Sequence, residues 1–295
     1  MLLLLGVSSS EAAKNWGFEL STGPGYRQDR VEWSYSTNKE VYPHLKMFDW
    51  MLSFDASLGS VHLIGEGDRG WFSAQEMRKS ADTAFPSSAS FSFDTSGKAT
   101  TAVLYLGYSL GSYSTISFMP MAGWMYDSEV LHRSHPIPPF SRLTQNIPEP
   151  YSFADASIEM LSNLRQRWQG ALLGAQLTLQ FFKGWFLQGS YAYGWLHFSQ
   201  SFSEVESLLY YQPGPVLATQ VQTTVQGDTS GGGGHGNLGK LKMMILLSKE
   251  ISLDFDFRYF ALNSGKISTS IQSSNQKVDA KLSSALFTTE LSYRF

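Results

Sequence analysis

A two-residue alternation of apolar and charged side chains is the feature of this sequence that most constrains its fold. In the stretch ISLDFDFRYF, residues 251–260, every second side chain from Ile251 onward is apolar, whereas Asp254, Asp256 and Arg258 fall between them. Successive side chains of a β-strand point to opposite faces, so this stretch predicts a strand with one apolar and one charged face. The segment FTTELSYRF repeats the pattern. The charged residues on one face of these strands are too many for the apolar core of a soluble protein. The pattern favours a barrel with lipid outside and water inside, and a soluble β-sandwich is the alternative.

The same rule predicts ten strands along the chain. They cover residues 17–35, 45–57, 60–73, 98–110, 113–130, 162–181, 185–202, 237–248, 251–266 and 281–295. Links of about two or three residues follow the second, fourth, sixth and eighth strands, and the other links are long, as in barrels of the outer membrane. The expected fold is therefore an all-β, ten-stranded antiparallel up-and-down transmembrane β-barrel.

This connectivity also predicts how the barrel is oriented. With an even number of strands, both termini lie at the end that carries the short links, and that end faces the periplasm in outer-membrane barrels. We therefore expect a bacterial-type outer-membrane location with the long links outside the cell. The links at 131–161 and 203–236 would form the exposed working surface. The stretch GDTSGGGGHGN, residues 227–237, is expected to be a flexible loop tip.

Composition excludes several classes of function. The formal net charge is −3, so no basic surface is expected to neutralise the phosphates of a nucleic acid. The chain has no cysteine, which leaves no disulfide or thiolate chemistry. No stretch approaches the roughly 18 consecutive apolar residues that a spanning helix needs. We expect no cofactor and no metal site.

The two ends of the sequence carry their own signals. The start, MLLLLGVSSSEAAKNW, has a short Leu run and then small residues, which is typical of the tail of a secretory signal cleaved after Ala12 or Ala13. A frayed apolar N-terminus is the alternative. We expect residues 1–13 to be a signal remnant and residues 14–295 to be one barrel domain. The final Phe, preceded by alternating apolar residues, resembles the assembly signal of bacterial outer-membrane barrels.

Several motifs resemble the omptins, which are outer-membrane surface proteases and adhesins. RVEWSYSTNKEVYPHLKMFDW is similar to the first hairpin of that family, and MAGW at 121–124 is similar to its fifth strand. RQRW at 165–168 and the segment GALLGAQLTLQFFKGWFLQGSYAYGW resemble strands six and seven. The resemblance covers most strands and little of the links. It implies a ten-stranded, monomeric barrel.

The resemblance also implies where an omptin would hold its catalytic groups. Omptins use an Asp pair after strand three and an Asp-His pair after strand seven, with water as the nucleophile. The first place offers Glu76 and Asp82 without an Asp-x-Asp. The second offers Glu204 and Glu206 without a following His. His132 and His135, beside Asp127 and Glu129, offer another weak base or metal-binding group. We therefore expect the peptidase activity to be absent, and these five Glu and His residues are the catalytic candidates only if it is present.

Two further sets of residues follow from the predicted barrel. Omptins contact the phosphate of lipid A, and the resemblance implies Arg167 as the candidate for this contact here. Alternatively, Arg167 is an ordinary charged residue at the rim of the barrel. A mixed set is expected to line the lumen: Arg30, Glu32, Asp254, Asp256, Arg258, Glu290 and Arg294. These residues would line a water path or pair and plug it. The expected function is surface interaction, as in an adhesin, with outer-membrane lipid and a surface peptide or host protein as partners. An active omptin-like endopeptidase and a small-solute pore are the alternatives.

Overall fold

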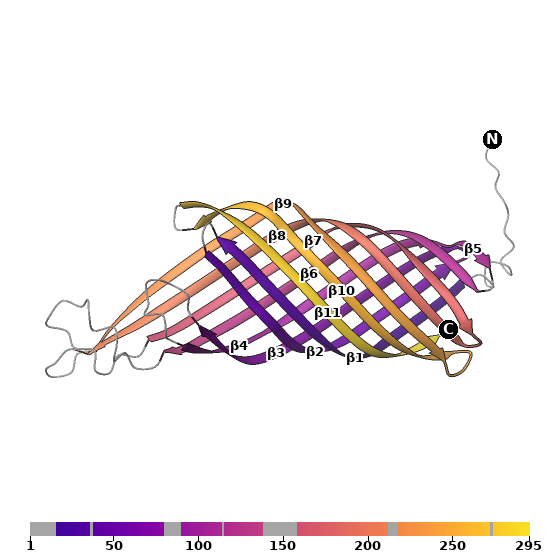
Figure 1. Cartoon of the computed structure of the whole chain (residues 1–295), viewed down its shortest axis with the longest axis horizontal. Helices are drawn as coiled ribbons and strands as arrows, with labels where there is room; N and C mark the ends of the chain where they lie inside the picture. Colours follow the sequence, from indigo (N-terminus) through magenta and orange to yellow (C-terminus); the bar gives the residue numbers. More distant parts are fainter. Residues whose placement is uncertain are drawn as a thin grey trace.

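The computed structural model of the chain is a single closed antiparallel barrel (Figure 1). It describes residues 16–35, 38–79, 90–113, 115–137, 158–211, 218–271 and 274–295. The strands are β1 (Trp16–Tyr35), β2 (Asn38–Leu58), β3 (Val61–Lys79), β4 (Ser90–Tyr108), β5 (Leu110–Tyr113), β6 (Ile116–Ile137), β7 (Ile158–Phe182), β8 (Trp185–Tyr211), β9 (Ala218–Leu246), β10 (Ile251–Ile271) and β11 (Ser274–Arg294). Among the described residues there is no helix long and apolar enough to cross a membrane.

Ten long strands form the wall, and each pairs with its neighbours in sequence. β1 closes the sheet against β11, and β4 pairs directly with β6. The four-residue β5 is an extra ribbon on β6 within the link between β4 and β6. Closure leaves no strand of the wall without a neighbour on both sides, although the described pairing of β2 with β3 ends at Phe48 and Trp71. The prediction of a ten-stranded antiparallel barrel is confirmed.

The strands are longer than the sequence pattern predicted. The short links after β2, β7 and β9 lie at the end of the barrel that carries the C-terminus (Figure 1). At the other end, β1 and β2 are separated by two residues only, and β8 and β9 extend to Tyr211 and from Ala218. The expected loop at 203–236 is therefore mostly strand, since pairing continues from Phe202 with Gly227 to Tyr211 with Ala218. Of the expected loop at 131–161, residues 138–157 lie outside the described part, as do residues 1–13.

The glycine-rich stretch is part of β9 rather than a loop tip. Leu196 of β8 pairs with Gly234, but His197 pairs with Gly232, so Gly233 is an extra residue in the ladder. Its φ of 109° is a conformation that side chains other than glycine rarely adopt. The expectation of a flexible tip was wrong because pairing with β8 holds this glycine run in the ladder, and one glycine forms a β-bulge. β10 pairs with the stretch at its two ends, at Gly227 and Asp228 and from His235 onward.

The polarity of the two faces reverses along the barrel. Near the short links, the outward residues of β7 are apolar, from Phe181 to Leu173, whereas Arg167 and Arg165 follow further along the same face. Inside, the order is opposite. The charged groups described below lie level with the apolar outer band, and beyond them the interior is filled by buried apolar side chains: Val31, Leu45, Met47, Phe72, Leu131, Leu164, Trp168, Phe198, Leu262, Ile267 and Leu282. Burying each of these large side chains contributes roughly 1.5–3 kcal/mol.

Candidate functional site

The most concentrated group of charges lies around Arg27, inside the barrel. The side chain of Arg27 is fully buried. Its Nε donates to the carboxylate of Asp29 at 2.9 Å, and its two terminal nitrogens lie 2.9 Å from Asp68 and 3.4 Å from Asp127. Glu129 is 3.8 Å away. One guanidinium is therefore surrounded by four carboxylates from β1, β3 and β6.

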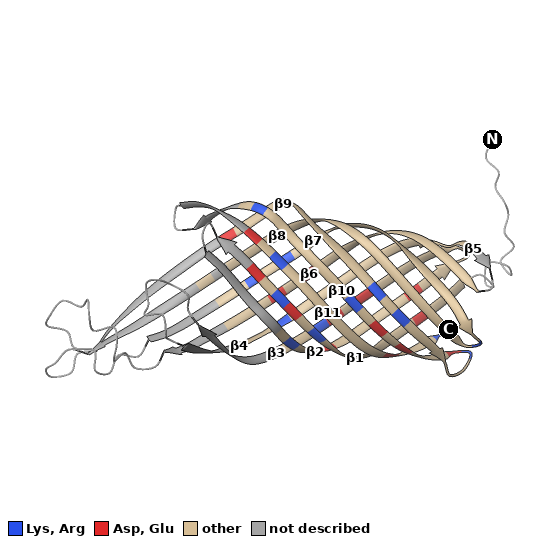
Figure 2. Ribbon diagram, viewed as in Figure 1, with Lys and Arg blue, Asp and Glu red and all other residues tan. Residues whose placement is uncertain are grey.

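Two smaller networks of ion pairs also fill the interior of the barrel. Lys240 and Arg258 contact Glu66 at 2.5 and 3.2 Å, and Asp256 at 3.1 and 3.0 Å. Next to them, Lys242 lies 2.6 Å from Asp254. Figure 2 shows charges of both signs close together in the middle of the barrel. Such paired charges fill space as a core does, because each carboxylate is held by a cation or a hydroxyl.

The structure places the residues expected in the lumen in two groups. Asp254, Asp256, Arg258 and Glu290 are buried in the interior. Arg30 and Glu32 lie instead on the outer face of β1 and pair with each other, because the inward positions are Arg27, Asp29 and Val31. This section of β1 lies beyond the apolar band, where the apolar side chain points inward.

Arg294 also lies outside the interior networks. Its side chain is 51% exposed, and its guanidinium lies 2.6 Å from Glu19 at the end that carries the short links. This pair joins β11 to β1 at the rim of the barrel.

The catalytic candidates do not form one described cluster. His132 is exposed on the outer face of β6, where its Nδ1 lies 2.5 Å from Asn163 Oδ1, while its neighbours Asp127 and Glu129 point inward. The side chains of Glu76, Glu204, Glu206 and His135 lie outside the described residues, although their backbones belong to β3, β8 and β6. Among the described residues, no three His, Asp or Glu side chains are placed to hold a metal ion.

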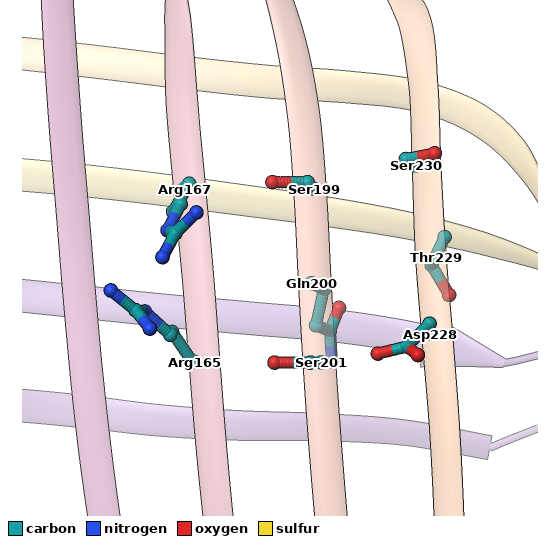
Figure 3. A pocket seen from close by; sticks show the side chains of 8 residues that line it. All are labelled: Arg165, Arg167, Ser199, Gln200, Ser201, Asp228, Thr229 and Ser230. Atoms are coloured by element: carbon teal, nitrogen blue, oxygen red, sulfur yellow. The ribbon is translucent and has the colours of Figure 1, made fainter.

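A shallow pocket on the outer wall contains the lipid-binding candidate. It has a volume of about 290 Å³ and extends across β7, β8 and β9. Strand pairing aligns Arg167 with Ser199 and Ser230, and Arg165 with Ser201 and Asp228. Figure 3 shows the two arginines one after the other along β7.

The chemistry of this pocket fits an anionic group. The Nε of Arg167 is buried and has no hydrogen-bond partner within the described part of the chain. The two guanidiniums and the serine hydroxyls are donors suited to phosphate or sulfate oxygens. Because apolar outward residues begin two positions beyond Gln169 on β7, the pocket lies at the edge of the apolar band.

Sequence reasoning missed Arg27, Asp29 and Arg165. Arg27 and Asp29 lie in the alternating stretch YRQDRVEW. Because Val31 and Trp33 were expected to face lipid, Arg27 and Asp29, which share their face of the strand, were not expected inside. A signal was present in the spacing of Arg27 and Asp29, two residues apart, which places both on one face of a strand.

Comparison with solved structures supports the fold. The outer membrane protease OmpT from Escherichia coli is similar over 95% of this chain and 97% of its own, with 12% sequence identity and a TM-score of 0.58. At this identity the likeness shows the fold alone, and it confirms the omptin-like barrel expected from the sequence. The toluene transporter TodX of Pseudomonas putida (11% identity, 97% and 91% covered, TM-score 0.34) and the attachment invasion locus protein Ail of Yersinia pestis (9%, 94% and 98%, 0.25) are too distant in shape to carry an argument.

Comparison by sequence gives the family. A search of curated proteins returned no significant match. The profile described as Pom, Protochlamydia outer membrane protein, matches residues 21–209. This range covers more than half of the chain and runs from β1 to the far part of β8. The chain is thus an outer-membrane β-barrel and belongs to the Protochlamydia outer membrane protein family.

Proposed function

We propose that this protein is a non-conducting, monomeric outer-membrane barrel that makes contacts at the cell surface, as adhesins do, and lacks omptin-type peptidase activity. The observation that carries the proposal is the filled interior. The Arg27 network and the apolar side chains beyond it, with Trp168 and Phe198 rings 4.5 Å apart, occupy the space that a pore would need. The outer wall and the links then remain as working surfaces. The end with the short links faces the periplasm in this proposal.

The first test is conductance. We expect the refolded protein to insert into a planar bilayer and to show no discrete channel steps, because buried ion pairs and apolar side chains fill the described part of the interior. A refolded porin in the same bilayer is the positive control, and circular dichroism confirms the folded state. Regular steps from the folded protein would contradict a closed barrel and would favour the small-solute pore.

The surface role needs a binding measurement. Protein in lipid nanodiscs is passed over immobilised host-cell surface proteins, with empty nanodiscs as the control. Saturable binding that is lost after protease trimming of the exposed links supports the proposal. Cleavage of peptides by the same sample, abolished in Glu204→Gln, would instead indicate an active endopeptidase.

A lipid partner is part of the proposal and rests on the outer-wall pocket. We propose that Arg165 and Arg167 bind the phosphate of an anionic lipid of the outer membrane. Arg165→Gln with Arg167→Gln is expected to weaken binding of lipid A about tenfold to a hundredfold, since a charge-assisted hydrogen bond contributes roughly 1.5–3 kcal/mol. Native mass spectrometry in detergent measures the bound fraction.

The matched control for the lipid measurement is Lys98→Gln. Lys98 is an exposed cation on β4, away from the pocket. Equal losses in the control and in the double variant would mean that net charge alone attracts the lipid, and the pocket would then have no specific role.

A further inference from the structure

Three polar side chains meet inside the barrel at the end that carries the short links. Asp55 lies near the end of β2, His62 near the start of β3, and Ser109 in the link after β4. The Nδ1 of His62 is 3.1 Å from Asp55 Oδ1 and 3.3 Å from Oδ2. Its other ring nitrogen, Nε2, is 3.1 Å from the hydroxyl of Ser109. This is the order of contacts in which a carboxylate orients an imidazole and the imidazole receives a proton from a hydroxyl.

The contact with Asp55 favours one tautomer of the neutral imidazole. A carboxylate only accepts hydrogen bonds, so Nδ1 of His62 carries the hydrogen and donates it to Asp55. In the neutral ring, Nε2 then has a free lone pair, and the Ser109 hydroxyl donates to it. His62 is thereby held as a base toward Ser109. The three residues are recognised by their geometry and roles, since no fixed sequence spacing is required for this arrangement.

Regular strand pairing holds the three groups in place. His62 is paired with Ser57 on β2 and with Gly107 on β4. The backbone N–H of Ser109 donates to the carbonyl of Ser60 at 2.8 Å, which fastens the link to the turn between β2 and β3. A site whose members lie on paired strands and a fastened link keeps its geometry better than one on a free loop.

The group is open to solvent on one side and apolar on the other. The side chains of His62 and Asp55 are 22% and 39% exposed, so both are in contact with solvent. The next inward residues, Ile64 and Tyr105, are buried, and Met119 lies against Gly107. An apolar wall beside a nucleophile suits an acyl chain.

We propose that Ser109, His62 and Asp55 form an acyl-transfer site for small carboxylic esters at this end of the barrel. Ser109 Oγ attacks the ester carbonyl carbon while its proton moves to His62 Nε2, and that proton then passes to the leaving alcohol as the ester C–O bond breaks. Water next attacks the acyl group on Ser109, gives one proton to His62 and releases the carboxylic acid. The proton on His62 returns to Ser109. Asp55 orients His62 throughout.

The backbone of Ser109 sets the expected reactivity. Its N–H already donates to Ser60 and is not free to stabilise an oxyanion. We therefore expect turnover of activated esters and reaction with fluorophosphonates, rather than cleavage of peptide bonds.

The test uses the folded full-length barrel in detergent. A fluorophosphonate probe is expected to label the wild-type protein, and mass spectrometry is expected to locate the adduct on Ser109. Hydrolysis of p-nitrophenyl butyrate is measured on the same sample. Ser109→Ala should abolish both signals, and His62→Gln and Asp55→Asn should lower the hydrolysis rate by about 10²–10⁴-fold.

Ser57→Ala is the matched control, since Ser57 is paired with His62 on the same inner face and its hydroxyl donates to the Gly17 carbonyl rather than to a member of the site. This variant should keep both labelling and hydrolysis. Absence of an adduct on Ser109 in protein that is folded by circular dichroism would overturn the proposal. So would hydrolysis that is unchanged in Ser109→Ala, because another group would then carry it.

Discussion

Replacing Arg27 by methionine is expected to lower the free energy of unfolding of the barrel by about 3–5 kcal/mol. The variant leaves Asp29, Asp68, Asp127 and Glu129 buried around a site that has lost the one cation in contact with all four among the described residues. Like charges at these distances repel strongly in a medium that screens poorly. The cation–π contact of the guanidinium with Phe260, 5.1 Å from the ring centre, is lost as well.

Urea unfolding in lipid vesicles, followed by tryptophan fluorescence, measures the effect of Arg27→Met. Two controls separate charge from packing. Arg27→Lys keeps the charge and should recover part of the loss, although one ammonium cannot reproduce the fork that contacts several carboxylates. Asp127→Asn keeps a hydrogen-bond acceptor for Thr101 and removes one of the surplus anions, so we expect a change below about 1 kcal/mol. A tolerated Arg27→Met would show that the carboxylates are neutralised by other means.

The second large effect is expected from Trp168→Ala. Trp168 of β7 is fully buried in the barrel interior, and its ring lies against that of Phe198 on β8. Removing an indole from a packed interior costs about 3–5 kcal/mol, since the apolar area and the aromatic contact are lost and a cavity remains.

The same unfolding measurement tests Trp168→Ala, with Trp168→Phe as the control. The control keeps most of the apolar contact, and because the indole Nε1 has no hydrogen-bond partner within the described residues, no such bond is lost. We expect the control to lose less than about 1.5 kcal/mol. Equal losses in the two variants would indicate that the shape of the whole indole, rather than buried area, holds this layer together.

The fold was predictable because the alternation in β10 and β11 is strict. Asp254, Asp256 and Arg258 lie inside and Phe257 and Tyr259 outside, as the period of two requires. The strand ends were less predictable. Beyond the apolar band the outer wall is polar and the interior apolar, so Val31 points inward and Arg30 outward. The polarity reverses while β1 continues, although its register with β2 shifts between Asp29 and Val31. A rule that assigns apolar residues to lipid fails there.

The candidate sites were predictable only in part. Arg167 was identified, but its partner Arg165 and the serines beside it become a pocket only when β7, β8 and β9 are in register. Asp55, His62 and Ser109 are even further from detection, since nothing in their spacing brings a residue of the β4–β5 link to the start of β3. Strand pairing alone makes these residues neighbours.

The pairing of β1 with β11 determines when the barrel can form. Tyr26 lies opposite Phe287, about 260 positions away along the chain. Contacts of such separation form late, because closing a long loop costs entropy before any contact compensates it. Until β11 is in place, β1 presents unpaired backbone groups that lipid does not tolerate. The chain therefore has to remain outside the bilayer core, or be shielded at the exposed edge of β1, until β11 is in place. The strands are thus not expected to insert into the bilayer one at a time.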